Sequence, residues 1–316
     1  MTFNQKITQL RNTILVNLKP IIGEKCVLIG LPYYMNIGDV LIWEGTRYML
    51  KCQRVRCLDI ASKETFTYPT LDKSVTILLQ GGGNFGDLWK AEQNFRTTVI
   101  ERYPNNRIII LPQTVYYQDD KNVKEDSHKY GNHHDLYICG RDINSYDYLK
   151  KNFSKNNIML LPDMAFCIQP SSLEKYKLKK RGKALLLKRI DKELQSYDFA
   201  VHIKNKYPLE TRDWPTIEQP YSGHLLSFFL RLISNKERYG KFTDWYADKI
   251  FRPYMLRCGV GFVSSYDEIF TTRLHVAILS ILLEQGFVFF DNAYGKNSSF
   301  YESWLDDIEN VKFIRR

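Results

Sequence analysis

The chain has 316 residues, of which 44% are hydrophobic and 25% charged. These values are close to globular averages and argue against a disordered, collagen-like or disulfide-stapled protein. The formal net charge of +10 favours anionic partners, such as phosphorylated small molecules or an anionic membrane surface. The basic residues are spread along the sequence without a known nucleic-acid-binding motif, so we expect no nucleic-acid partner.

Location and cofactors can also be predicted from composition. The first residues, MTFNQKITQLRN, lack a signal-peptide core, and no run of about 18 apolar residues occurs. We therefore expect a cytoplasmic protein. Six cysteines show no CxxC pair and no metal-ligand spacing, so no metal site is predicted. Aromatic residues make up 14% of the chain, and aromatic rings can stack on sugars as well as fill cores.

The first half of the chain alternates short apolar runs with amphipathic stretches, which is typical of an α/β protein with a parallel sheet. Buried strands are expected at Lys25–Gly30, Val75–Leu79, Arg107–Leu111, Leu136–Cys139 and Ile158–Leu161, and helices at Asp39–Cys52, Asn94–Tyr103 and Ser145–Asn152. We expect these elements to form one Rossmann-like domain over residues 1–176. A lysine-rich stretch, Glu174–Lys183, is interpreted as a linker.

After the linker the pattern restarts, which predicts a second Rossmann-like domain over residues 177–316 and a cleft between the two domains. Strands are expected at Ala184–Leu187, Tyr197–His202, Gly259–Val263 and Phe287–Phe290, and a helix at Arg273–Glu284. The polar and aromatic segment Tyr207–Tyr239 receives no assignment.

Loops that follow strands are the first places to search for a ligand, because ligands of open α/β sheets lie beyond the carboxyl ends of the strands. Asn36 and Asp39 lie in such a loop, where Asp39 could serve as a helix cap or as a ligand contact. Gly82, Gly83 and Asn84 belong to the run QGGGNFGD, which either cradles an anion with backbone N–H groups or forms a tight turn. This run is neither a dinucleotide fingerprint nor a P-loop.

Three loops in the second half carry charged groups. Arg189 follows a predicted strand and suits carboxylate or phosphate recognition, although a surface ion pair would explain it as well. Arg273 and His275 lie at the expected start of a helix capped by Thr271 or Thr272. A helix start with an arginine and a titratable histidine predicts an anion site with its own proton donor. The loop around Tyr294 and Lys296 is either part of that site or a solvated turn.

Several segments together resemble the polysaccharide pyruvyltransferase family, in particular its exopolysaccharide-biosynthesis branch. The matching pieces span most of the chain in order: NIGDVLIWEG (36–45), LLQGGGNFGDLW (78–89), LPQT (111–114), GRDINSYDYL (140–149), LPDMAF (161–166), TTRLH (271–275) and DNAYGKN (291–297).

This resemblance implies a glycosyltransferase-B-like pair of Rossmann-like domains, with phosphoenolpyruvate as co-substrate and no cofactor or metal. It implies that Arg273, His275 and the Leu274 backbone hold this donor. Arg189 is our candidate for a second donor arginine, and Tyr294 and Lys296 are assigned to the same side. The acceptor or cleft side is assigned to Asn36, Asp39, Gly82, Gly83, Asn84 and Asp163.

The chemistry requires a general acid and a base. Protonated His275 suits delivery of a proton to the methylene carbon of phosphoenolpyruvate. Asp39, Asp163 and Glu193 are all possible bases by residue type. The acceptor is expected to be a sugar of a bacterial surface polysaccharide, free or lipid-linked. A lipid-linked acceptor would explain positive charge through contact with the inner membrane face.

Two other classes of function remain open from the sequence. A glycosyltransferase with a nucleotide-sugar donor would use the same scaffold, because a fold does not determine a function. A non-catalytic binder of anionic polysaccharide or membrane would also be basic and aromatic-rich. The second alternative predicts that replacing His275 leaves function intact.

Overall fold

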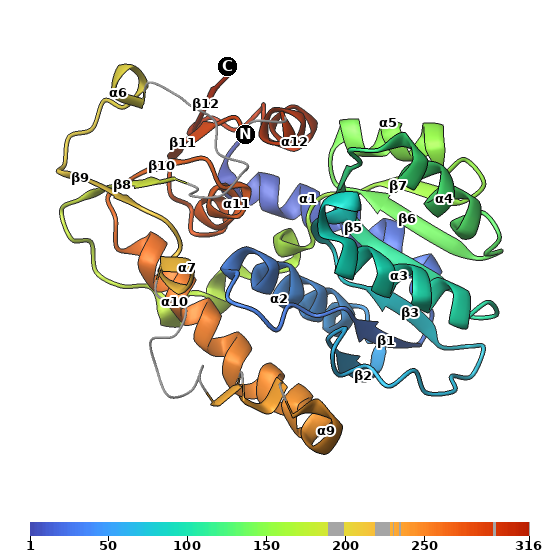
Figure 1. The fold of residues 1–316 in the computed structure, drawn as a ribbon. Helices are drawn as coiled ribbons and strands as arrows, with labels where there is room; N and C mark the ends of the chain where they lie inside the picture. Colours follow the sequence, from blue (N-terminus) through green and yellow to red (C-terminus); the bar gives the residue numbers. More distant parts are fainter. Residues whose placement is uncertain (189–198, 219–227, 230, 234, 293–294, 316) are drawn as a thin grey trace.

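The computed structural model describes all residues except 189–198, 219–227, 230, 234, 293–294 and 316. It contains two parallel β-sheets with helices packed on them (Figure 1). The seven-stranded sheet has the order β2-β1-β3-β5-β6-β7, with β4 paired to β5, and the five-stranded sheet has the order β12-β11-β10-β8-β9. The predicted mixed α/β class with parallel sheets is therefore confirmed.

The strands of the first sheet are β1 (Lys25–Ile29), β2 (Arg56–Ala61), β3 (Thr76–Leu79), β4 (Gly82–Gly86), β5 (Ile108–Tyr116), β6 (Leu136–Gly140) and β7 (Asn157–Leu160). Those of the second are β8 (Ala184–Leu187), β9 (Leu209–Arg212), β10 (Glu268–Thr271), β11 (Phe287–Phe290) and β12 (Val311–Ile314). The central strands β3 and β8 are buried along their whole length, as expected for parallel strands covered on both faces.

The helices of the first half are α1 (Phe3–Ile22), α2 (Ile37–Cys52), α3 (Lys90–Arg102), α4 (Asp120–Tyr130) and α5 (Ile143–Asn152). Those of the second half are α6 (Phe199–His202), α7 (Pro215–Glu218), α9 (Lys236–Tyr246), α10 (Arg252–Ser264), α11 (Leu274–Leu282) and α12 (Lys296–Trp304). A five-residue π-turn, Ala247–Phe251, joins α9 to α10. Within the described ranges, no helix is both long enough and apolar enough to cross a membrane.

Helices α1, α2 and α11 lie between the two sheets (Figure 1), and α11 packs against both α1 and α2. The largest apolar cluster takes residues from both sides of this layer, for example Leu28 and Leu78 of the first sheet and Leu185 and Ile269 of the second. The close fit of α2 depends on Gly45, because a Cβ there would lie only 1.9 Å from the carbonyl oxygen of Met164. This contact brings the middle of α2 close to the loop that follows β7.

Two predicted strands are wrong. Gly259–Val263 lies within helix α10, whose buried residues Met255, Leu256, Val260 and Val263 recur at helical spacing. A short apolar run does not distinguish a buried strand from a buried helix. Of Tyr197–His202, the described residues Phe199–His202 form helix α6, and residues 197–198 lie outside the described part of the chain.

Two details at helix starts also differ from prediction. Asn36 caps α2, because its side chain accepts a hydrogen bond from the Gly38 N–H at 3.0 Å, whereas Asp39 lies inside the first turn. At α11 the N-cap is Arg273 rather than a threonine. Thr271 instead accepts a hydrogen bond from the Arg273 N–H at 2.9 Å. At each start one N–H group is therefore satisfied by the side chain two residues before it.

The glycine-rich run forms a strand and not only a turn. Gly82–Gly86 pairs with β5 in parallel, next to the carboxyl end of β3. The segment Glu174–Lys183, interpreted as a linker, contains one short turn of 3-10 helix, Glu174–Tyr176, and then leads into β8.

Candidate functional site

A cavity of about 610 Å3 lies between loops that follow the strands of both sheets. Its described lining residues are Tyr34, Met35, Asn36, Asp39, Gly83, Asn84, Trp89, Glu92 and Arg141 from the first half, and Trp214, Thr216, Ile217, Arg273, Leu274, His275, Asn292, Lys296 and Asn297 from the second. This position at the carboxyl ends of parallel strands is the usual ligand position in open α/β sheets.

His275 sits in the first turn of α11 and packs on the start of α2. A Cβ on Gly38 would lie 2.5 Å from Nδ1 of His275, so only a glycine at this position leaves room for the imidazole. Two residues of the motif Asn36–Asp39 thus have separate roles. Asn36 caps α2, and Gly38 leaves room for the side chain of His275 from the other half of the molecule. This contact was not predicted from the sequence.

Asp163 faces His275 from the loop after β7. Its Oδ2 lies 3.3 Å from Nε2 of His275 and 2.9 Å from Nη1 of Arg141, and its Oδ1 accepts a hydrogen bond from the Ala165 N–H at 2.9 Å. Burial alone would raise the pKa of Asp163, but the facing charges of His275 and Arg141 hold it at about 2. Asp163 is therefore a permanent negative charge beside the imidazole.

Nε2 of His275 is buried and has no hydrogen-bond partner among the described residues. Its contact with Asp163 is consequently one of charge rather than of a well-aligned hydrogen bond. The buried carboxylate and the imidazole therefore face each other directly, 3.3 Å apart.

Asp39 is the second carboxylate of the site and is held differently. Its Oδ2 accepts hydrogen bonds from the Tyr34 hydroxyl at 2.9 Å and from Nδ2 of Asn36 at 2.8 Å. Its Oδ1 points towards the glycine-rich strand, 3.5 Å from the place that a Cβ on Gly82 would take. Desolvation raises the pKa of Asp39, although the charge of His275 and the Tyr34 hydrogen bond oppose the shift.

Arg273 is buried at the N-cap of α11 and forms a bidentate ion pair with Asp213. Nε and Nη2 of the guanidinium each lie 2.5 Å from one carboxylate oxygen. Asp213 follows β9 and is 1% exposed. Such a pair fixes the plane of the guanidinium, since both donors and both acceptors are aligned. Arg273 still lines the cavity, next to the N–H groups at the start of α11.

The residues of the second half form one wall of the cavity, and a polar loop after β11 completes this wall. Oδ1 of Asn292 accepts hydrogen bonds from the backbone N–H groups of Lys296, at 2.7 Å, and Asn297. Nδ2 of Asn297 in turn donates to the carbonyl oxygens of Thr272 and Phe290, each at 2.9 Å. This network ties the loop to the end of β10 and places the ammonium of Lys296 5.7 Å from the centre of the Tyr116 ring.

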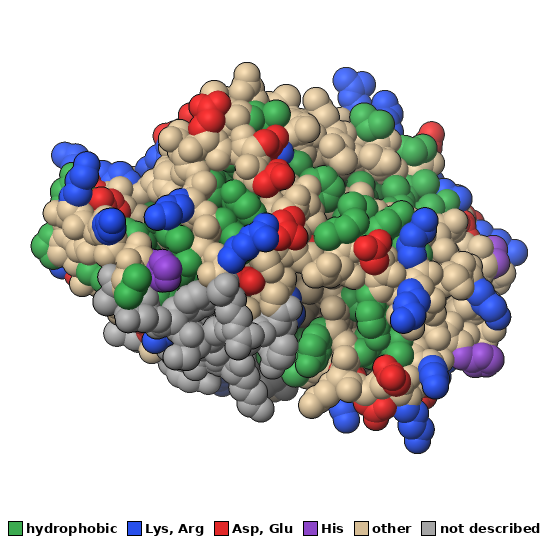
Figure 2. All heavy atoms as spheres, turned by 90° about the horizontal axis from the view of Figure 1, so that it is seen from above, with side chains coloured by type: hydrophobic (Ala, Val, Ile, Leu, Met, Phe, Trp, Pro, Cys, Tyr) green, Lys and Arg blue, Asp and Glu red, His purple; other side chains and the backbone are tan. Residues whose placement is uncertain are grey.

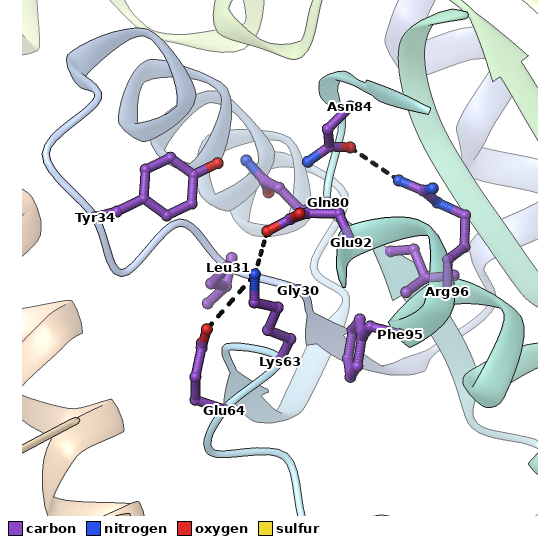
Figure 3. Close-up of a pocket in the computed structure, with 11 residues that line it drawn as sticks. Gly30, Leu31, Tyr34, Lys63, Glu64, Gln80, Asn84, Glu92, Phe95 and Arg96 are labelled. Atoms are coloured by element: carbon purple, nitrogen blue, oxygen red, sulfur yellow. Dashed lines mark hydrogen bonds and ion pairs between the residues drawn. The ribbon is translucent and has the colours of Figure 1, made fainter. Parts of the chain in front are cut away.

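A smaller hollow adjoins the cavity along the first wall (Figure 3). It shares Tyr34, Asn84 and Glu92 with the main cavity. Lys63 points between Glu64 and Glu92, and Oδ1 of Asn84 accepts a hydrogen bond from Nη2 of Arg96 at 2.9 Å. The side chain of Asn84 is therefore held by Arg96 of helix α3.

Most of the predicted site residues come together in this cavity. Asn36, Asp39, Gly83, Asn84, Arg273, Leu274, His275 and Lys296 line it, and Asp163 lies directly behind His275. Gly82 is buried in β4 beside Asp39. Arg189, Glu193 and Tyr294 lie outside the described residues, so their predicted roles stay predictions.

Three residues of the site were not predicted: Asp213, Trp214 and Arg141. Asp213 and Trp214 lie in the segment that received no assignment, where β9 is only four residues long. The signal was present as a strand followed by an Asp-Trp-Pro turn. Arg141 stands in the quoted segment GRDINSYDYL, and its contact with Asp163 depends on the pairing of the successive strands β6 and β7.

On the face drawn in Figure 2, lysine and arginine side chains are dispersed, with aspartate and glutamate side chains among them. This face therefore offers no continuous basic track of the kind that follows a nucleic-acid backbone.

The cleft combines arginine, lysine and histidine with the carboxylates of Asp39, Glu92 and Asp163, at loops that follow parallel strands. These features define an enzyme-like site for an anionic ligand. A sequence model of the polysaccharide pyruvyl transferase family matches residues 36–294, which include every described residue of the cavity except Tyr34, Met35, Lys296 and Asn297. The chain belongs to this family and is a polysaccharide pyruvyltransferase.

Two curated relatives support this membership. A Bacillus subtilis protein named "Putative pyruvyl transferase EpsO" is 31% identical over 294 residues, which cover 92% of this chain and 89% of the relative. "Pyruvyl transferase 1" of Schizosaccharomyces pombe is 26% identical over 301 residues, covering 89% of this chain and 70% of the relative.

A solved structure shares the fold. The crystal structure of a functionally uncharacterised protein from Klebsiella pneumoniae superposes with a TM-score of 0.62 at 20% identity, covering 97% of this chain and 98% of the other. At this identity the likeness concerns the fold alone.

Proposed function

We propose that the protein transfers the enolpyruvyl unit of phosphoenolpyruvate onto two hydroxyls of one sugar, forming a cyclic ketal and releasing inorganic phosphate. The acceptor is a sugar of a bacterial surface polysaccharide or of its lipid-linked precursor. The observation that carries the proposal is the buried Arg273 and the protonatable His275 at the start of α11, within a cavity that faces two carboxylates.

The two halves take different tasks in this proposal, as in glycosyltransferase-B-like enzymes. Residues 177–316 bind the donor and residues 1–176 bind the acceptor. The donor side is supported by its cationic lining, since Arg273, Lys296 and the N-terminus of α11 all favour a carboxylate and a phosphate. Arg189 and Tyr294 are proposed to complete it. The acceptor side is supported by Trp89 and Tyr34, whose exposed rings suit a sugar face.

His275 acts as the general acid. It delivers a proton to the methylene carbon of phosphoenolpyruvate, which becomes a methyl group and leaves a cationic carbon at the former double bond. The first sugar hydroxyl attacks this carbon and loses its proton. Asp163 positions the imidazole for this step, because its buried carboxylate lies 3.3 Å from Nε2 of His275.

The phosphate then leaves with its bonding electrons and takes up a proton. The second hydroxyl attacks the same carbon and loses its own proton, which closes the ketal. Two protons are gained and two are lost, so the reaction is balanced. Arg273 and Lys296 stabilise the negative charge that moves onto the departing phosphate.

Asp39 is the better candidate for the base among the three carboxylates predicted by type. Both oxygens of Asp163 are engaged, by Arg141 and the Ala165 N–H, and its side chain is 1% exposed. Asp39 lines the cavity with one oxygen towards the glycine-rich strand. Desolvation raises its pKa, which makes its carboxylate a stronger proton acceptor. Glu193 lies outside the described residues.

The proposal is tested by thermal denaturation with phosphoenolpyruvate, a UDP-hexose or phosphate alone. A ligand at one hundred times its dissociation constant adds about 2.7 kcal/mol of stability. We expect selective stabilisation by phosphoenolpyruvate, lost in Arg273→Ala and retained in the exposed control Lys19→Ala. Stabilisation by the UDP-hexose alone would overturn the donor and favour a nucleotide-sugar glycosyltransferase. Ketal formation that stops after treatment with a metal chelator would contradict metal-free catalysis.

A further inference from the structure

Helix α9 carries a stripe of basic and aromatic side chains on its outer face. Arg238, Phe242, Trp245 and Lys249 follow one another at spacings of four, three and four residues, so they share one side of the helix and the π-turn after it. All four are exposed; Phe242 is 46% exposed and Trp245 51%. We call these four residues the basic-aromatic stripe. Figure 1 places α9 at the lower edge of the molecule, on the side of β2.

The aromatic members of the stripe are stacked on each other rather than inserted into the core. The rings of Phe242 and Trp245 have centroids 5.6 Å apart and an interplanar angle of 19°. Two large apolar rings at about half exposure cost free energy in water, at roughly 25 cal/mol for each Å2 of apolar surface. They therefore indicate a surface that is covered in the working state of the protein.

Charge separates the two faces of α9 and the π-turn. The acidic residues Asp244 and Asp248 are buried: Asp244 accepts a hydrogen bond from the Tyr33 hydroxyl at 2.9 Å, and Asp248 pairs with Arg47 and, at 2.9 Å, with the ammonium of Lys249. Every described charged side chain that is exposed between positions 238 and 249 is basic: Arg238, Lys241 and Lys249. The outer face is thus complementary to a negatively charged, partly apolar surface.

A hollow of about 470 Å3 continues this face towards β2. Trp245 and Lys241 form one of its sides, and Val55, Leu58 and Ile60 supply apolar walls on the other. Lys241 pairs with Asp59 at 2.6 Å, which fixes α9 to the edge of the sheet. The charged part of its lining is mixed, with Arg47, Lys51 and Lys241 beside Asp59, Asp244 and Asp248, so the hollow adds apolar surface rather than net charge to this face.

We propose that the basic-aromatic stripe docks on the surface of an anionic lipid bilayer. Aromatic rings favour the interface between headgroups and acyl chains, and lysine and arginine bind the anionic headgroups. A neutral protein partner would not explain the one-sided charge, and a second copy of this face would bring like charges together.

Docking through α9 also has a consequence for the active site, which rests on the proposed lipid-linked acceptor. Tyr33, whose hydroxyl binds Asp244, is the neighbour of Tyr34 in the loop that lines the cavity. Thr65 also donates a hydrogen bond to Asp244, at 2.6 Å. A bilayer bound at α9 would thus be connected, through Asp244 and Tyr33, to the loop that lines the cavity.

The proposal is tested by sedimentation with vesicles of phosphatidylcholine alone and of equal parts phosphatidylcholine and phosphatidylglycerol. Three proteins are compared first: the wild type, Arg238→Glu/Lys249→Glu and Phe242→Ser/Trp245→Ser. We expect the wild type to bind the anionic vesicles preferentially and each double variant to bind at least about fivefold more weakly, since each basic residue near an anionic surface contributes about 1 kcal/mol. The wild-type binding should also weaken with added salt.

Matched controls remove the same charge and apolar surface elsewhere. Lys121→Glu/Lys124→Glu on α4 changes the net charge equally, and Val16→Ser/Val201→Ser removes two exposed apolar side chains from α1 and α6. Both controls should bind like the wild type, and all variants should keep the wild-type melting temperature within a few degrees.

Three results would overturn the proposal: equal binding of the wild type to both kinds of vesicle, no binding to either, or unchanged binding of the stripe variants. A dimer seen by light scattering and dissociated by Phe242→Ser/Trp245→Ser would assign the stripe to a second copy instead. The result is independent of the reaction, because His275→Asn should bind vesicles normally, while stripe variants should still react with a water-soluble acceptor.

Discussion

Each wall of the cleft buries an arginine against an aspartate, but the two pairs are built differently. Arg273 and Asp213, in the second half, form a closed two-pronged pair within one wall. Arg141 and Asp163, in the first half, share a single contact of 2.9 Å, and the same carboxylate oxygen faces His275 from the opposite wall. The Arg273–Asp213 pair holds the guanidinium of Arg273 in place. The Arg141–Asp163 pair instead lets one carboxylate oxygen contact both Arg141 and His275 of the opposite wall.

This difference indicates separate tasks for the two aspartates. Asp213 orients the guanidinium of Arg273, so its loss should disturb donor binding. Asp163 acts on the imidazole of His275, so its loss should disturb proton transfer. Neither aspartate needs to touch the substrate for this, and we regard both as positioning residues.

The largest expected effect comes from replacing His275, which contacts residues of both walls. His275→Asn should lower kcat by about 10²–10⁴, the usual contribution of a general acid, with little change in phosphoenolpyruvate binding. The measurement is steady-state phosphate release with a sugar acceptor. Exposed His128→Asn on α4 is the control. Activity of His275→Asn close to wild type would refute its role as acid.

The next test separates the two pairs directly. Asp213→Ala and Asp163→Ala each leave a buried cation uncompensated and should lower the free energy of unfolding by about 3–5 kcal/mol. The milder Asp213→Asn should mainly raise KM for phosphoenolpyruvate, and Asp163→Asn should mainly lower kcat. Equal changes of KM and kcat in Asp213→Asn and Asp163→Asn would contradict separate roles for the two aspartates.

A smaller effect is expected where the two walls touch. Gly38→Ala places a Cβ 2.5 Å from Nδ1 of His275, and such overpacking costs about 1–3 kcal/mol. Activity should fall with stability, because the imidazole must move. Gly240→Ala is a matched control, since nothing lies within 4 Å of its added Cβ. In helix α9 this change should stabilise by about 0.5–1 kcal/mol.

The smallest effect concerns pH. A base must be ionised to act, so the raised pKa of Asp39 moves the acid limb of the kcat/KM profile to higher pH than that of an ordinary aspartate. Asp163 contributes to this raised pKa through like charge. Asp163→Asn should therefore shift the limb to lower pH, by less than about one unit, or 1.4 kcal/mol. An upward shift in the measured profile would contradict the assignment of the base.

Much of the fold could be predicted because its parallel strands are buried on both faces. Runs such as Val75–Leu79 and Ala184–Leu187 are continuous apolar stretches with clear boundaries. The edge strand β2 escaped prediction because its sequence, RCLDIA, is half exposed and lacks such a run. Gly259–Val263 was placed in the wrong class because burial, rather than periodicity, dominates a five-residue window.

The cavity residues could be predicted where a strand ends in a recognisable polar loop. Asn36, Asp39, Arg273 and His275 are of this kind. Their partners could not be predicted, because pairing across the sheets is a tertiary property. Asp213 lies 60 residues before Arg273, and nothing local marks it as a partner of that arginine. The dependence of His275 on Gly38 is equally non-local.

Helix α1 has a consequence for how the molecule unfolds. Although it begins the first half, its Lys6 pairs with Asp307 at 2.6 Å, close to the other end of the chain. Arg11 of the same helix donates a hydrogen bond to the Ile168 carbonyl at 2.8 Å. A protease cut between residues 177 and 183 would therefore sever the chain without releasing either piece. The two sheets should melt in a single cooperative transition, since neither can lose this shared helix and keep its own packing.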